Sequence, residues 1–151
     1  MSKRDLTLIM ITILLVAGMV IMLFTDRNSA VLERTLDYDL PVSSEIVEMK
    51  KHGSLFSRSS YEAKITLSID APEQLQSTII KTYGVDGTYI SQDEFETMKN
   101  DIFEGMTIIP SPQIHTTMWL QNVKTKDGHK ITHIMCAEDD SHAYLYIYYN
   151  R

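Results

Sequence analysis

The chain has 151 residues, a formal net charge of −6 at pH 7 and a single cysteine, Cys136. The roughly 127 residues after position 24 suffice for one domain and not comfortably for two, and one cysteine excludes an internal disulfide. Only Lys3, Arg4 and Asp5 are charged before position 25, so the acidic excess belongs to the rest of the chain, where it repels nucleic acid and anionic lipid.

The stretch Leu6–Phe24 holds nineteen residues and no charge. At about 1.5 Å of rise per residue, such a helix spans roughly 28 Å, close to the hydrocarbon thickness of a bilayer. A cleavable signal has a shorter apolar core, and Asn28–Ala30 is a poor cleavage site. We therefore expect an uncleaved transmembrane anchor at 6–24, a cytoplasmic tail at 1–5 and export of the larger C-terminal part to the outer side of the cell membrane.

Residues 25–39 are mixed and polar, without a sustained period, and indicate a juxtamembrane stalk. The apolar residues between Val31 and Leu36 would share a helical face, so a short helix that continues the anchor is the alternative. Pro41 disfavours helical geometry in the residue before it. We expect the extracytoplasmic domain to occupy residues 40–151.

Two strand patterns open this domain. Residues 44–51 alternate only moderately and carry charges, which is typical of an edge strand. Residues 61–69 alternate cleanly, so we expect one face to be buried and the polar face to meet water. The predicted buried residues are Ala63, Ile65, Leu67 and Ile69.

At Asp70 the spacing of the apolar residues changes from every second residue to about every 3.6 residues, which is the period of a helix. Asp70 is a natural N-cap, Pro72 suits the first turn, and Glu73 completes the spacing of a capping box. Gly84 predicts the end of the helix.

A second helix repeats these signals. Ser91 and Glu94 have the spacing of a capping box, and Gly105 follows the predicted end. Ile90, before the cap, is expected to pack against Phe95 as a hydrophobic staple. Two amphipathic helices thus follow one another.

The last third of the chain predicts a meander of three strands. Residues 116–125 and 129–138 flank Lys126–Gly128, and Asp-Gly between β-rich runs is a strong hairpin signal. The final strand, 143–149, alternates cleanly. The sequence does not decide which face of strand 129–138 is buried, because a change of one residue in the turn length exchanges its two faces.

The order ββααβββ predicts an α+β protein. We expect an N-terminal transmembrane helix followed by a two-layer domain, in which an antiparallel sheet of about five strands carries the two tandem helices on one face.

The histidines invite a metal hypothesis. His129 and His133 stand four apart on a predicted strand, about 13 Å at about 3.3 Å per residue, which is too far for two ligands of one ion. If Asp127-Gly128 is a two-residue loop, His133 lies opposite Asn122 and far from His115. We expect no metal site.

Catalytic patterns are weak. The acidic turn 138–140 lacks the ligand spacing of a calcium loop. Cys136, with His133 or His142 as base, could be a nucleophile, but a cysteine in a strand is more often a small hydrophobic residue. The serines between positions 54 and 60 lack the glycines of a nucleophile elbow. No catalytic residue and no cofactor are expected.

One candidate binding surface is aromatic. Tyr144, Tyr146 and Tyr148 form a stripe on one face of the last strand, and exposed tyrosines can bind glycans or peptides. The alternative is ordinary pairing of aromatic residues across a sheet.

These features favour a non-enzymatic interaction module, held in the lipid bilayer by Leu6–Phe24 and binding a membrane-protein or cell-envelope partner. An anchored envelope hydrolase and an immunity-like protein that captures a basic toxin are the alternatives. The layout is similar to that of the small single-span proteins of Gram-positive bacteria; no motif identifies a family.

Overall fold

The computed structural model describes residues 3–53, 60–102, 106–108, 110, 118–137 and 141–150. For residues 3–6, 21–29, 99, 101 and 102 it describes the backbone alone. The helix end predicted at Gly105, the acidic turn 138–140 and the serines within 54–59 lie outside the described residues. The chain divides into two compact units, Met1–Asp37 and Tyr38–Arg151.

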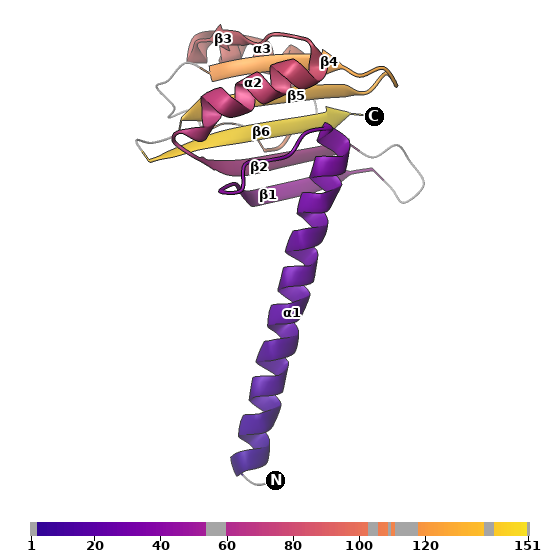
Figure 1. Ribbon diagram of the computed structural model, residues 1–151, viewed down its shortest axis with the longest axis vertical. Helices are drawn as coiled ribbons and strands as arrows, with labels where there is room; N and C mark the ends of the chain where they lie inside the picture. The colour runs from indigo at the N-terminus through magenta and orange to yellow at the C-terminus, as the bar shows by residue number, and fades with distance from the viewer. Residues whose placement is uncertain are drawn as a thin grey trace. The chain divides into compact units, whose positions relative to one another are not determined.

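The first unit consists mainly of one continuous helix, α1 (Lys3–Leu36), shown in indigo in Figure 1. Residues 25–36 are therefore helical, in agreement with the alternative of a helix that continues the predicted anchor, and the juxtamembrane stalk at 25–39 stays a prediction. No glycine or proline interrupts residues 25–36. Asp37 ends the helix by taking a left-handed conformation, with φ at 54°.

No helix of the described residues is long and apolar enough to count as a membrane span. The anchor predicted at Leu6–Phe24 includes positions 6 and 21–24, whose side chains lie outside the described part, and it stays a prediction.

The second unit is built on a six-stranded antiparallel sheet in the order β1-β2-β6-β5-β4-β3 (Figure 1). This confirms an α+β fold and an edge strand near 44–51. The strand β3 was missed, because its three residues are too few to show an alternating pattern. The strands are β1 (Glu45–His52), β2 (Ser60–Ser68), β3 (Thr88–Ile90), β4 (Met118–Lys124), β5 (Lys130–Ala137) and β6 (His142–Asn150).

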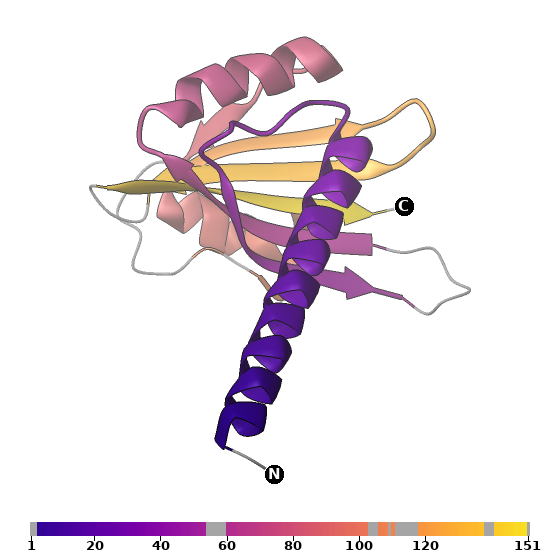
Figure 2. The ribbon, with the colours of Figure 1, turned by 60° about the horizontal axis from the view of Figure 1, so that its bottom comes forward.

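The helices α2 (Ala71–Tyr83) and α3 (Gln92–Ile102) cover opposite faces of this sheet, as Figure 2 shows. Gln76 of α2 donates a hydrogen bond to Sδ of Met135 over 3.8 Å. Phe95 of α3 instead shares a buried cluster with Ile134, whose side chain points to the other face because neighbours in a strand alternate. The predicted two-layer arrangement with both helices on one face is wrong. Strand β3 pairs with β4 and forms one edge of the sheet. At this edge the chain passes from the face that α2 covers to the face that α3 covers.

The cluster under α3 forms one half of the core. It consists of Ile90, Phe95, Ile108, Met118, Leu120, Ile134, Cys136 and Tyr146, so the predicted packing of Ile90 with Phe95 is confirmed. The other face, on which Ile65 pairs with Leu145, is covered by α2 through Leu75 and Ile79. Both faces of β5 are therefore buried, which answers the question that its sequence left open.

The helix end predicted at Gly84 and the capping box predicted for Ser91 and Glu94 are confirmed. Gly84, with φ at 67°, donates its N–H to the carbonyl of Ile80, and Ser91 and Glu94 exchange the two hydrogen bonds of a capping box. Pro72 lies in the first turn of α2 as expected. The side chain of Asp70 makes no capping bond, because its backbone is helical (φ −89°, ψ −7°) and not extended as at an ordinary N-cap.

The hairpin between β4 and β5 is confirmed, with a different loop. Thr125 donates its N–H to the carbonyl of His129, and Gly128, with φ at 82°, lies in the left-handed region. The loop is longer than the two residues considered above, so His133 pairs with Gln121 instead of Asn122.

Candidate functional site

The predicted tyrosine surface lies on the face that α3 covers. Tyr146 is only 1% exposed and belongs to the cluster around Phe95, while Tyr144 and Tyr148 are half-buried. The ammonium group of Lys64 lies 4.1 Å from the ring centroid of Tyr144. A continuous row of solvent-exposed rings is therefore not formed, because α3 packs over its central member.

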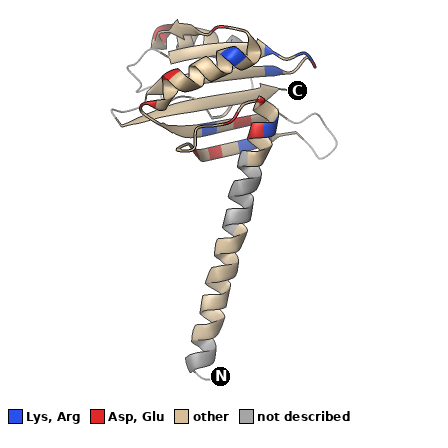
Figure 3. Ribbon diagram, in the orientation of Figure 1, with Lys and Arg blue, Asp and Glu red and all other residues tan. Residues whose placement is uncertain are grey.

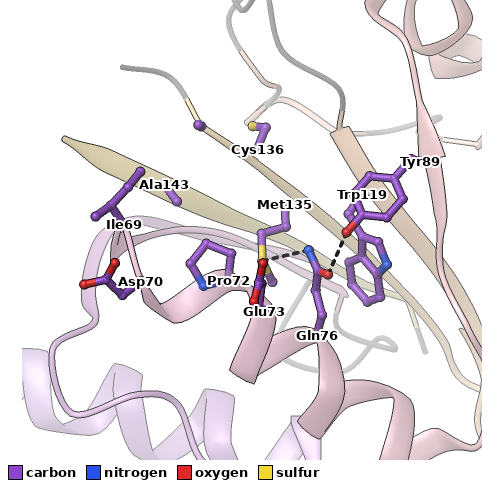
Figure 4. Close-up of a pocket in the computed structure, with 11 residues that line it drawn as sticks. Ile69, Asp70, Pro72, Glu73, Gln76, Tyr89, Trp119, Met135, Cys136 and Ala143 are labelled. Atoms are coloured by element: carbon purple, nitrogen blue, oxygen red, sulfur yellow. Dashed lines mark hydrogen bonds between the residues drawn. The ribbon is translucent and has the colours of Figure 1, made fainter. Parts of the chain in front are cut away.

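A pocket of about 590 Å³ lies on the opposite face, between the first turns of α2 and the sheet (Figure 4). Its floor comes from Trp119 of β4, Met135 of β5 and Ala143 of β6. Its wall comes from α2 and the turn before it, through Asp70, Pro72, Glu73 and Gln76. The other lining residues are Ile69, Tyr89, Cys136 and Ala137.

The strand register explains why this pocket exists. Tyr89 pairs with Trp119, and Trp119 pairs with Met135, so three large side chains from β3, β4 and β5 form one row across the sheet. Two residues further along β5, Ala137 pairs with Ala143 of β6. Two small side chains at these paired positions leave the space that the pocket occupies.

The indole of Trp119 is held in place by a close backbone. A Cβ atom added at Gly87 would lie 2.2 Å from Cε2 of Trp119, which is too close for any side chain. Trp119 itself is only 2% exposed, whereas Tyr89 beside it is 62% exposed. The pocket thus has a rigid aromatic floor and a solvent-exposed aromatic rim.

Two hydrogen bonds orient the amide in the pocket wall. The hydroxyl of Tyr89 donates to Oε1 of Gln76 over 3.0 Å, and Nε2 of Gln76 donates to the sulfur of Met135. Thioether sulfur is a weak acceptor. The amide N–H is therefore available to a better acceptor on a ligand.

The remaining polar groups of the pocket are acidic. Asp70 and Glu73 line it, and no lysine or arginine is among its described lining residues. Because Asp70 does not cap α2, its carboxylate is not used by the helix end. Figure 3 shows the same asymmetry along α2, with an acidic residue in the first turn and Lys81 in the last.

Glu62 on the other face has a structural role. It is fully buried, and its carboxylate accepts hydrogen bonds from the N–H of Thr107 (2.7 Å), the hydroxyl of Thr107 (2.8 Å) and the N–H of Ile108 (2.6 Å), and it contacts Nε2 of His52. Burial raises the pKa of Glu62, but these hydrogen bonds outweigh it, and the net pKa is below the ordinary value. The expectation that this face of the strand meets water was wrong at Glu62, whose hydrogen bonds hold Thr107 and Ile108 against β2.

His133 is the other buried polar residue of note. Both ring nitrogens are buried without a hydrogen-bond partner, and burial lowers its pKa to about 3. The rings of Tyr38 and Tyr83 lie 5.9 and 5.7 Å from it, and the hydroxyl of Tyr38 is also unpartnered. The thiol of Cys136 belongs to the cluster on the opposite face, so His133 does not meet it.

The histidines do not gather into a metal site within the described ranges, where no group of three or more histidine, cysteine, aspartate or glutamate residues could hold an ion. His129 contacts the hydroxyl of Tyr149 through Nδ1.

Comparisons with protein-family models, with curated proteins and with solved structures each found no match. The chemistry of the pocket therefore carries the functional argument. This pocket was not predicted from the sequence, because Asp70 and Glu73 matched a capping signal and β3, which brings Tyr89 to Trp119, was not recognised. The one available signal was the chain's single tryptophan beside a β-rich run.

Proposed function

We propose that the chain is a membrane-tethered binding module whose folded unit, Tyr38–Arg151, takes a ligand in the pocket under α2. The observation that carries this proposal is the pocket itself. Ligand sites are typically concave, about 300 to 1,000 Å³, mostly apolar and equipped with a few convergent polar groups. The pocket matches this description, with an aromatic and aliphatic floor beside Asp70, Glu73 and Gln76.

The tether is supported by α1. Its large apolar side chains between Leu8 and Val20 are 44% to 70% exposed, and residues 6–24 carry no charge. A continuous apolar surface of this kind is typical of a membrane or protein interface. We place the N-terminus in the cytoplasm and the folded unit outside, where tethering raises its effective concentration toward a membrane-protein or cell-envelope partner.

The lining favours binding over the envelope-hydrolase alternative. General acid–base or nucleophilic catalysis needs a nucleophile and a base within hydrogen-bond reach of each other. The described lining residues include one thiol, that of Cys136, whose side chain belongs to the cluster on the opposite face, and they include no histidine that could act as its base. The phenol of Tyr89 and the amide of Gln76 bond to each other.

The proposal is tested in membranes with the full chain. A photoreactive amino acid replaces Tyr89 at the pocket rim in one variant and Lys126, an exposed residue of the β4–β5 loop, in a matched control. We expect a discrete adduct at position 89 that is absent at position 126 and is lost when Trp119→Ala is added to a folded protein. Equal adducts at both positions, or none at position 89, would contradict binding at the pocket.

The tether has its own readout. In sealed protoplasts, added protease should degrade residues 38–151 and spare a cytoplasmic control protein. Protection of the folded unit would refute the orientation, and recovery of the chain in the soluble fraction would refute the tether.

A further inference from the structure

The charges at the pocket have one sign. Asp70 and Glu73 line it, Asp86 precedes the glycine that contacts Trp119, and the described lining includes no cationic side chain. Within the described chain, neither Asp70 nor Glu73 forms an ion pair with another residue. Both carboxylates are solvent-exposed. They would repel an anionic ligand in the pocket and attract a cationic one.

We infer that the pocket binds an organic cation, a protonated amine or a guanidinium group carried on an apolar stem. This inference rests on the proposed binding function and names its ligand class. The cation would lie between the carboxylates of Asp70 and Glu73, and the stem would lie along the floor formed by Trp119, Met135 and Ala143.

The aromatic pair strengthens this assignment. Tyr89 and Trp119 are cross-strand neighbours, and both line the pocket. The faces of tryptophan and tyrosine rings attract ammonium and guanidinium groups. Apolar side chains at the rim, with Ile69 47% and Tyr89 62% exposed, suit the apolar part of the same ligand.

The N-terminus of α2 does not reverse the sign of the field. A helix N-terminus carries a partial charge of roughly +0.5, which is smaller than the two unit negative charges of Asp70 and Glu73 beside it. The net field at this end of the pocket is therefore negative.

The chain carries its own reporter, because Trp119 is its single tryptophan. The full chain in zwitterionic lipid nanodiscs is titrated with hexylammonium, hexanol and hexanoate, which share one apolar stem and differ in charge, and Trp119 fluorescence is recorded. We expect hexylammonium to bind at least tenfold more tightly than hexanol, hexanoate to give no saturable change, and the hexylammonium affinity to fall as salt rises.

Charge-removing variants locate the effect. The double variant Asp70→Asn/Glu73→Gln should weaken hexylammonium binding about tenfold or more, in line with the loss of a charge pair. Asp93→Asn on α3, which removes one exposed carboxylate on the opposite face, should leave it unchanged. Thermal unfolding of each variant checks the fold, and Asp70→Asn is a mild change because its side chain makes no capping bond.

Two blocked peptides distinguish the sources of the cation. Acetyl-Gly-Arg-Gly-amide and its citrulline counterpart differ in charge at nearly equal shape. Binding of the arginine peptide alone points to a basic side chain of a protein partner, and binding of hexylammonium without the peptide points to a free amine.

Tighter binding of hexanol or hexanoate, or an unchanged affinity in the double variant, would overturn the cation assignment and leave the binding function in place. A complete lack of response to every probe would also overturn it, and the adduct at position 89 would then decide the proposed function separately.

Discussion

Acid should destabilise the folded unit through His133. Burial lowers the pKa of its imidazole from 6.5 to about 3, so the folded state keeps His133 neutral at a pH where the unfolded chain takes up a proton. Stability is therefore lost as pH falls below the unfolded pKa of about 6.5, and the loss stops near the folded pKa.

The size of this loss follows from the shift. One pKa unit corresponds to about 1.4 kcal/mol, so the free energy of unfolding should fall by about 2 kcal/mol between pH 7.5 and pH 5, and by roughly 4 kcal/mol when the pH reaches about 3. These are large fractions of the roughly 5 to 15 kcal/mol by which most domains are stable. The neighbouring rings of buried Tyr38 and half-buried Tyr83 carry no carboxylate that could pair with an imidazolium.

The measurement is urea unfolding of the full chain, followed by the fluorescence of the buried Trp119 at several pH values. His133→Leu should flatten the dependence between pH 7 and pH 5 and should keep full stability at pH 7.5, because it removes two unpartnered ring nitrogens. His142→Leu, at an exposed position, should keep the wild-type slope. Equal slopes for wild type and His133→Leu, or a titration of His133 near pH 6.5, would refute the reasoning.

Three further changes test the fold. Glu62→Gln should lower the free energy of unfolding, measured in urea at pH 7, by about 2 to 5 kcal/mol, because its charged hydrogen bonds are lost. Since the folded pKa of Glu62 is lowered, the difference between wild type and variant should shrink as pH falls below about 4.5, and a constant difference would contradict this. Gly87→Ala should displace the indole of Trp119, shift its emission and cost about 1 to 3 kcal/mol, and an unshifted spectrum would count against the close contact. Phe95→Ala should cost about 3 to 5 kcal/mol by thermal or urea unfolding, whereas Thr66→Ala should stay within about 0.5 kcal/mol; similar values for both would argue against the core under α3.

The local elements could be predicted because their causes lie within a few residues. The capping box joins Ser91 to Glu94 three positions later, and Gly84 ends α2 by bonding to Ile80 four positions earlier. The alternation of Ala63, Ile65 and Leu67 records which side of one strand is buried, and all three are buried. The predicted burial of Ile69 was wrong, because β2 ends at Ser68 and Ile69 is 47% exposed. Such signals place helices and strands along the chain without reference to any distant residue.

The arrangement of these elements depended on contacts between distant residues. Three residues of β3 pair with β4 some thirty positions later, and this pairing carries α3 to the face opposite α2, buries Tyr146 and brings Tyr89 beside Trp119. Glu62 likewise looks like a solvent-facing residue until Thr107 and Ile108 supply its hydrogen bonds. The sequence by itself located α2, α3 and every described strand except β3, because backbone hydrogen bonding and side-chain periodicity are local. Only the tertiary structure decided which faces are covered and where the pocket opens, because strand pairing joins residues whose separation along the chain leaves no periodic trace.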